Sequence, residues 1–210
     1  MKLSVFFFGL SLIFLLGILF YFNLDFRNEE NDFEITGRVI YTDYIGDIIF
    51  VPVKVHLVKV EDDSLSTVRD EENIIQLFGE VNRIWEDSNI YFSVEEVVHE
   101  EISKDVYLNS QRNLQFISEY TKTDEKYIDA YFMRSIGGPN GVAFPELNYI
   151  FVSDITTVND FRATSHEFGH ILDLVHVPNS NFLMARGRNG EFISDFEIGK
   201  ARNAAFDLFV

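Results

Sequence analysis

The sequence predicts an α+β fold: a mixed, mostly parallel twisted sheet backed by helices, preceded by a transmembrane helix. Three observations lead to this prediction. The chain has 210 residues, 47% of them hydrophobic, which is enough for one domain with its own core. From residue 51 onward, segments with strand periodicity alternate with segments with helix periodicity. An uncharged apolar stretch precedes them at the N-terminus.

The composition excludes several functional classes. The chain has 34 acidic and 17 basic residues and a formal net charge of -17. We therefore expect no nucleic-acid partner, because a phosphate-binding surface needs an excess of lysine and arginine. The chain has no cysteine, which excludes disulfides, thiolate nucleophiles and cysteine-ligated zinc.

The N-terminal stretch predicts a membrane segment. Residues 3–24 carry no charge, and a helix of this length spans about 33 Å, against about 30 Å for the hydrocarbon core of a bilayer. Lys2 precedes the stretch and several acidic residues follow it, which predicts a single-pass anchor with a cytoplasmic N-terminus and the rest of the chain outside. The alternative is a signal peptide, and the protein would then be secreted. The C-terminal end of the apolar stretch, Phe20–Leu24, lacks the small residues of a signal-peptidase cleavage site, which favours the anchor.

The first half of the exported part predicts two strands and two helices after a linker or short pro-like segment at residues 25–50. Residues 51–60 alternate as a strand, and Ile90–Val98 does so again. Between them, Asp70 is expected to cap an amphipathic helix that ends near Ser88. Its apolar face consists of Ile74, Leu77, Phe78, Val81 and Trp85. A second helix is expected at Ser110–Tyr120, and a short strand at Phe33–Tyr41 within the linker.

The second half predicts three strands and two helices. Strands are expected at Tyr127–Met133, at Gly141–Phe144 as a sheet edge, and at Tyr149–Val152. A helix should start from a capping box at Thr157–Asp160. A closing helix should run from Ser194 to Leu208, packed through Ile198, Ala201, Ala205 and Leu208.

The candidate chemistry lies on the first of these two helices, in the motif His166-Glu167-Phe168-Gly169-His170. Histidines four residues apart on a helix are neighbours on one face, so both imidazoles can bind one ion. Glu167 is adjacent to the first histidine and can reach a water at that ion. This H-E-x-x-H pattern is the zinc signature of metalloproteases.

Zinc in a catalytic site takes three protein ligands and keeps one position open. His176 is the candidate third ligand, but a continuous helix would point it away from His170. The chain must therefore turn between them. Asp173 is the expected turning point, because aspartate tolerates positive φ better than most residues other than glycine.

The segment from His166 to His176, HEFGHILDLVH, resembles the metzincin pattern H-E-x-x-H-x-x-G-x-x-H, and Met184 matches the methionine turn of that family. The spacing is most similar to the matrixin branch, the matrix metalloproteinase-like enzymes. The resemblance implies a zincin-like catalytic domain at residues 51–210 with endopeptidase activity and one catalytic zinc. It further implies that His166, His170 and His176 are ligands, Glu167 the general base and Met184 the residue beneath the metal.

The sequence departs from the matrixin pattern at several points. Asp173 stands in place of the glycine, and Ala185 and Arg186 follow Met184, so the tyrosine ligand of some metzincins is absent. A cysteine switch is impossible without cysteine. The loop before Gly141 lacks the histidine and aspartate pattern of the matrixin structural zinc and calcium sites. One zinc is therefore predicted, and calcium is possible but not indicated.

Two alternative functions remain open. In a gluzincin the third ligand would be a glutamate, and Glu191 with Asp195 has the required spacing. However, Asn189-Gly190 indicates a turn, which would place Glu191 in a loop. The other alternative is a catalytically silent zinc-binding or adhesion module at the cell surface, against which the presence of Glu167 argues. His56 and His99 have no paired ligand spacing and are expected to be structural or exposed.

The expected partner is a peptide or protein substrate. Gly141, Val142, Ala143 and Phe144 form a candidate substrate-binding edge, to which a peptide would add as an extra strand. The alternative is that this segment is only a solvent-facing edge of the sheet. The stretch after Met184 is expected to line the specificity pocket. The sequence gives no indication of the oligomeric state.

Overall fold

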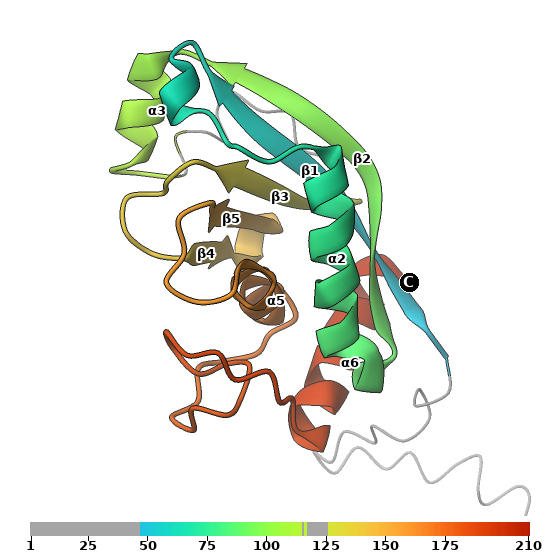
Figure 1. Ribbon diagram of the computed structural model, residues 1–210. Helices are drawn as coiled ribbons and strands as arrows, with labels where there is room; N and C mark the ends of the chain where they lie inside the picture. The colour runs from blue at the N-terminus through green and yellow to red at the C-terminus, as the bar shows by residue number, and fades with distance from the viewer. Residues whose placement is uncertain (1–46, 115, 117–125) are drawn as a thin grey trace, which may run out of the picture. The chain divides into compact units, whose positions relative to one another are not determined.

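The computed structural model describes residues 47–114, 116 and 126–210 (Figure 1). They form a five-stranded sheet in the order β2-β1-β3-β5-β4. The strands are β1 (Ile49–Val60), β2 (Ile90–Ile102), β3 (Ile128–Met133), β4 (Gly141–Phe144) and β5 (Tyr149–Ser153). The pairs β1–β2, β1–β3 and β3–β5 are parallel, and β4 pairs antiparallel with β5 at one edge. The predicted mixed, mostly parallel sheet is therefore confirmed.

The helices are α2 (Glu71–Trp85), α3 (Lys104–Ser110), α5 (Asp160–Ile171) and α6 (Asp195–Phe209), with short 3-10 turns η1 (Asp63–Leu65), η2 (Glu86–Ser88) and η3 (Pro145–Leu147). The apolar face predicted for α2 is buried, and Asp70 caps the helix in a capping box with Asn73. Ser194 and Glu197 form the predicted capping box of α6. These local signals were correct because each cap satisfies backbone groups that the first helical turn leaves unpaired.

Two hydrophobic clusters lie on opposite faces of the sheet. Side chains at odd positions of β1, such as Val53 and Val55, pack with α2, α5 and α6. Side chains at even positions, such as Val58, pack on the other face with Tyr131, Phe151 and Tyr107 of α3. Because both faces of β1 are covered, His56 is fully buried although its position in the alternating pattern suggests the polar face.

Residues 115 and 117–120 of the helix expected at Ser110–Tyr120 lie outside the described residues. The described helix α3, which Ser103 caps, precedes that segment and ends at Ser110. The structure differs from the sequence prediction at three points. The strand β2 continues to Ile102, past the predicted end at Val98, because it pairs with β1 along its whole length. Thr157 does not cap α5; its hydroxyl and its N–H donate to Asn140 Oδ1, at 3.1 and 2.7 Å, and the helix begins after Asn159. Leu208 is 43% exposed; the last buried residue of α6 is Ala205, and the partly buried Phe209 packs against the core in place of Leu208.

The predicted anchor at residues 3–24 and the predicted strand at Phe33–Tyr41 lie outside the described residues. Among the residues that the structure describes, no helix has the length and apolar character needed to cross a bilayer.

Candidate metal centre

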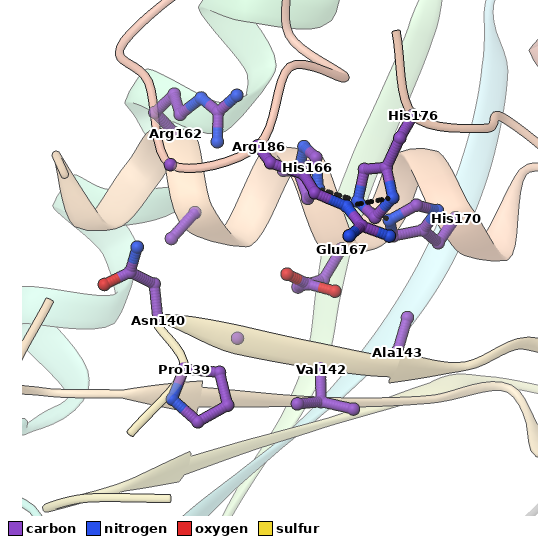
Figure 2. A pocket seen from close by; sticks show the side chains of 13 residues that line it. Pro139, Asn140, Val142, Ala143, Arg162, His166, Glu167, His170, His176 and Arg186 are labelled. Carbon is purple, nitrogen blue, oxygen red and sulfur yellow. Dashed lines mark hydrogen bonds between the residues drawn. The ribbon is translucent and has the colours of Figure 1, made fainter. Parts of the chain in front are cut away.

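Helix α5 carries the first half of the centre. It lies beside β4, and His166, Glu167 and His170 project from its surface toward one cavity (Figure 2). The helix is buried over most of its length, and Phe168 on its opposite side stacks on Phe92 with ring centroids 4.2 Å apart. The core contact on one side therefore fixes the direction of the two histidines on the other.

The turn after α5 carries the third histidine. Asp173 has a φ of +61°, as the sequence predicted for this position. The N–H of Leu174 donates to the carbonyl of Gly169 at 2.8 Å, which closes the helix, and the chain then reverses toward His176. Leu172 and Leu174 are buried beneath the turn. An ion pair between Lys200 of α6 and the Asp173 carboxylate, at 2.8 Å, ties the turn to the closing helix.

The turn brings the three Nε2 atoms together. His176 Nε2 lies 3.1 Å from His166 Nε2 and 3.1 Å from His170 Nε2 (Figure 2). Tetrahedral zinc with Zn–N bonds of about 2.0–2.1 Å places its ligand nitrogens about 3.3 Å apart. In the described part of the chain, these histidines are the single group of three or more histidine or carboxylate side chains close enough to share an ion. The donor set and its spacing fit one zinc ion.

The outer nitrogens of two histidines already have the partners that a zinc site requires. His166 Nδ1–H donates to the carbonyl of Leu183 at 2.8 Å, and His170 Nδ1–H donates to the carbonyl of Leu174 at 2.9 Å. Each bond fixes the tautomer that leaves a lone pair on Nε2. His176 differs, because its Nδ1 accepts a hydrogen bond from Arg186 Nε at 2.9 Å.

The surroundings keep the three imidazoles neutral. Burial lowers the pKa of His166 to about 3, and it also lowers the pKa values of His170 and His176. Neighbouring arginines lower the pKa values of the three histidines further. For His166 and His176, the neighbouring histidines also disfavour the charged form. Neutral imidazole is the form that binds a metal, and His166 and His170 already have the tautomer that ligation through Nε2 requires.

Glu167 lies between α5 and the edge strand β4 (Figure 2). Burial raises the pKa of its carboxyl to about 8, against the opposing influence of Arg162 and of a hydrogen bond from the N–H of Ala143. A divalent cation at the neighbouring histidines would favour the ionised carboxylate. Gly141 makes the close approach possible, because a Cβ at that position would lie 2.6 Å from Glu167 Cγ and 2.8 Å from its Oε1.

Met184 is fully buried, and its side chain lies against Gly169 of the histidine helix. The preceding residue, Leu183, supplies the carbonyl that orients His166. The N–H of Val177, next to the third histidine, donates to the carbonyl of Met184 at 3.1 Å. The segment around Met184 thus supports two of the three histidines.

The cavity beside the histidines has a volume of about 440 Å³. Gly141, Val142 and Ala143, three of the four residues of the predicted substrate-binding edge, line it. The fourth expected residue, Phe144, is not part of the lining, and its ring packs edge-on against Phe151 with centroids 5.8 Å apart. The cavity is further lined by Pro139, Asn140, Arg162, Ala163, Arg186 and Gly187.

Arg162 is a residue of the candidate site that the sequence analysis did not single out. Its side chain is buried and donates to the carbonyls of Leu183 and Ala185, and to that of Gly190 at 3.2 Å. It therefore holds the segment after the third histidine against α5. The signal in the sequence was an arginine one turn before His166, on a helix with few other charges.

The rejected ligand candidates lie elsewhere. Glu191 is in the loop before α6 and pairs with Arg83 at 3.0 Å. His56 is buried on the far face of the sheet, where its two ring nitrogens are hydrogen-bonded to Glu100 and Asp129, both at 2.7 Å. His99 is exposed on β2.

No protein-family model matches the sequence, and no curated protein matches it. Among solved structures, a chaperone–substrate complex matches with a TM-score of 0.48 and 15% identity, over 77% of this chain and 36% of that one. Mature mirolysin of Tannerella forsythia, with a cleaved peptide, matches with a TM-score of 0.44 and 14% identity, over 71% of each chain. A zinc-dependent peptidase of Methanocorpusculum labreanum matches with a TM-score of 0.41 and 14% identity, over 72% of this chain and 99% of that one. This chain thus spans about a third of the first of these structures, and similarities this loose leave its family open.

Proposed function

We propose that this protein is a zinc-dependent endopeptidase. One observation carries the proposal: the Nε2 atoms of His166, His170 and His176 converge beside the buried carboxylate of Glu167, in a cavity whose other wall is a sheet edge. A structural zinc site would need the histidines but would not need an acid beside them that faces a cavity. The positive φ at Asp173 and the position of Met184 support a metzincin-like site, with matrixin-like spacing, over a gluzincin site with Glu191 as ligand.

Three neutral imidazoles leave zinc its full charge and one open position, so the bound ion would polarise a peptide carbonyl and acidify water there. The protein's own contribution begins with orientation. The carbonyls of Leu183 and Leu174 hold two imidazole rings with Nε2 pointing inward. Arg162 then fixes the loop that provides the first of these carbonyls.

Glu167 is the proposed general base and acid. Its carboxylate accepts a proton from the attacking water and transfers the proton to the leaving amine nitrogen. Burial raises the pKa of this carboxyl and a cation at the histidines would lower it, so the group can both accept and release a proton. The N–H of Ala143 and the close contact with Gly141 keep the carboxylate near the cavity.

The edge strand β4 is the proposed substrate-binding element. It pairs with β5 along one edge, and within the described residues no strand pairs with its other edge. An extended peptide added there would run beside Glu167 and the histidines. We further propose that residues 1–24 tether the enzyme to a membrane with the catalytic domain outside, or are removed to release it.

The test uses the full-length protein, purified in detergent. We expect about one zinc per chain and cleavage of unstructured peptides that 1,10-phenanthroline abolishes. Glu167→Gln should keep the zinc and lower cleavage by about 10²- to 10⁴-fold. His176→Ala should lose the zinc, and His99→Ala should change neither zinc nor cleavage. A zinc-free protein, or full activity in Glu167→Gln, would contradict the proposal; zinc without cleavage would favour the silent zinc-binding module.

A further inference from the structure

We infer that Arg186 selects substrates that carry a carboxylate next to the scissile bond. The inference rests on the proposed peptidase function and specifies its substrate class. The relevant chemistry is that of a carboxylate close to the reacting carbonyl, which has two sources: the side chain of a neighbouring aspartate or glutamate, or the free C-terminus of a short peptide.

The charge of the cavity is opposite to that of the protein. The chain has a net charge of -17, but the cavity is lined by two arginines, Arg162 and Arg186, and by a single carboxylate, Glu167. With zinc on the three histidines, the cavity would carry still more positive charge. A cavity of this sign concentrates anionic groups and disfavours lysine and arginine side chains.

The two arginines have different roles. Arg162 is buried and its guanidinium is occupied by the carbonyls of Leu183, Ala185 and Gly190. Arg186 is exposed, and the hydrogen bond that its guanidinium makes within the described residues goes to His176 Nδ1. Arg186 is therefore the arginine whose donors can reach a ligand.

Metal ligation and the bond from Arg186 exclude each other. The Nδ1 atom of His176 accepts from Arg186 Nε, which places the hydrogen of the neutral ring on Nε2. A ring that binds zinc through Nε2 carries its hydrogen on Nδ1 instead, and an N–H cannot accept. The Nε donor of the exposed Arg186 is then released from His176 and is available to a ligand.

The position of Arg186 makes a substrate carboxylate the fitting partner. The residue follows Ala185, whose carbonyl Arg162 holds, so its backbone is anchored beside the histidines. The side chain extends toward His176 on the side of the cavity opposite β4 (Figure 2). A peptide lying between β4 and the histidines would thus pass within its reach. The planar guanidinium binds carboxylates through two parallel hydrogen bonds, which an ammonium group cannot reproduce.

The first experiment measures cleavage of a randomised peptide library with blocked termini by the full-length zinc-loaded protein. We expect enrichment of aspartate or glutamate next to the cleaved bond. A matched pair of peptides with glutamate or glutamine at that position should differ by about tenfold or more in kcat/KM, as expected for a charge-assisted hydrogen bond. The second source is tested with short peptides that end in either a free carboxylate or an amide. If the blocked peptides show no acidic preference but the free acid is cleaved about tenfold better than the amide, Arg186 recognises the C-terminal carboxylate of the substrate.

The second experiment assigns the preference to Arg186. Arg186→Gln should abolish it, and Arg186→Lys should retain only part of it, while the zinc content stays unchanged in both variants. Arg188→Gln is the matched control, because Arg188 is exposed two residues further on and does not line the cavity. A preference that survives Arg186→Gln, or one that Arg188→Gln removes equally, would overturn the inference.

A binding measurement separates this inference from the proposed function. The affinity of the zinc-loaded Glu167→Gln variant for uncleaved peptides is measured by fluorescence anisotropy. Tighter binding of the acidic peptide than of its neutral partner, lost on adding Arg186→Gln, supports the inference even if the wild-type protein cleaves nothing. Equal binding of the two peptides overturns it, whether or not the protein is a peptidase.

Discussion

The sulfur of Met184 occupies the space where a side chain on Gly169 would begin. A Cβ at Gly169 would lie 2.5 Å from Met184 Sδ and 3.2 Å from its Cε. The glycine of the His-Glu-Phe-Gly-His motif and the methionine beyond the third histidine are thus one packing unit. Since Met184 is fully buried in a close-packed core, a shift of its thioether would disturb the side chains around it.

Gly169→Ala should therefore destabilise the protein although alanine is the better helix former. We expect a loss of about 1–3 kcal/mol from overpacking and a weaker zinc site, measured by urea denaturation and by zinc titration. Gly79→Ala is the matched control, because Gly79 is also within a helix but a Cβ there meets nothing within 4 Å. That control should gain up to about 1 kcal/mol; equal effects of the two substitutions would disprove the packing argument.

Gly141→Ala should reduce catalysis without removing the metal. The added Cβ would displace Glu167, which is buried and held by the N–H of Ala143. Misplacement of a catalytic group by about 1 Å costs on the order of 10²-fold in rate. The measurement is kcat together with zinc content, and loss of zinc in this variant would show that the strand supports the metal site and not only the base.

Zinc should stabilise the folded protein, because it joins α5 to the turn that carries His176. At a free zinc concentration about 100 times the dissociation constant, the gain is about 2.7 kcal/mol. The melting temperature should fall when the metal is removed with a chelator and recover when zinc is added back. The shift should vanish in His176→Ala and persist in His99→Ala; a zinc-dependent shift in the first variant would place the ligand elsewhere.

The backbone at Asp173 should be strained for any residue with a Cβ. Its φ of +61° costs a residue other than glycine about 1–2 kcal/mol. Its ion pair with Lys200 is exposed on the aspartate side and offsets little of this cost. Asp173→Ala should therefore be less stable than Asp173→Gly by about 1 kcal/mol, measured by urea denaturation, and a more stable alanine variant would mean that the turn has rearranged.

His56 should be essential for stability and not for chemistry. Its ring is fully buried, stacks on Tyr131 with centroids 4.2 Å apart, and is hydrogen-bonded to Glu100 and Asp129. His56→Leu leaves the buried Asp129 unpaired, so we expect a loss of about 3–5 kcal/mol. His99→Leu should stay within about 0.5 kcal/mol. Adding Asp129→Leu to His56→Leu should recover part of the loss, and no recovery would locate the cost in packing instead.

The sequence predicted most elements because their signals are local. The apolar spacing on α2 and the caps at Asp70 and Ser194 act within one or two helical turns, and the structure contains each of them. The failures have the same cause. Thr157 has the pattern of a cap, but its hydroxyl donates to Asn140, which lies 17 residues earlier in the chain. A single-sequence pattern contains no information about such a distant partner.

In the candidate site, too, the local features were predictable from the sequence and the long-range contacts were not. The spacing of His166 and His170 and the turn at Asp173 follow from helix geometry and from the residue types, so the sequence alone determined the donor set. Only the tertiary structure decided what surrounds those donors. It placed Arg162 under the loop after the third histidine, Gly141 against Glu167, and Arg186 beside His176. These contacts join residues from separate elements, and their geometry depends on how the helices, loops and sheet pack together.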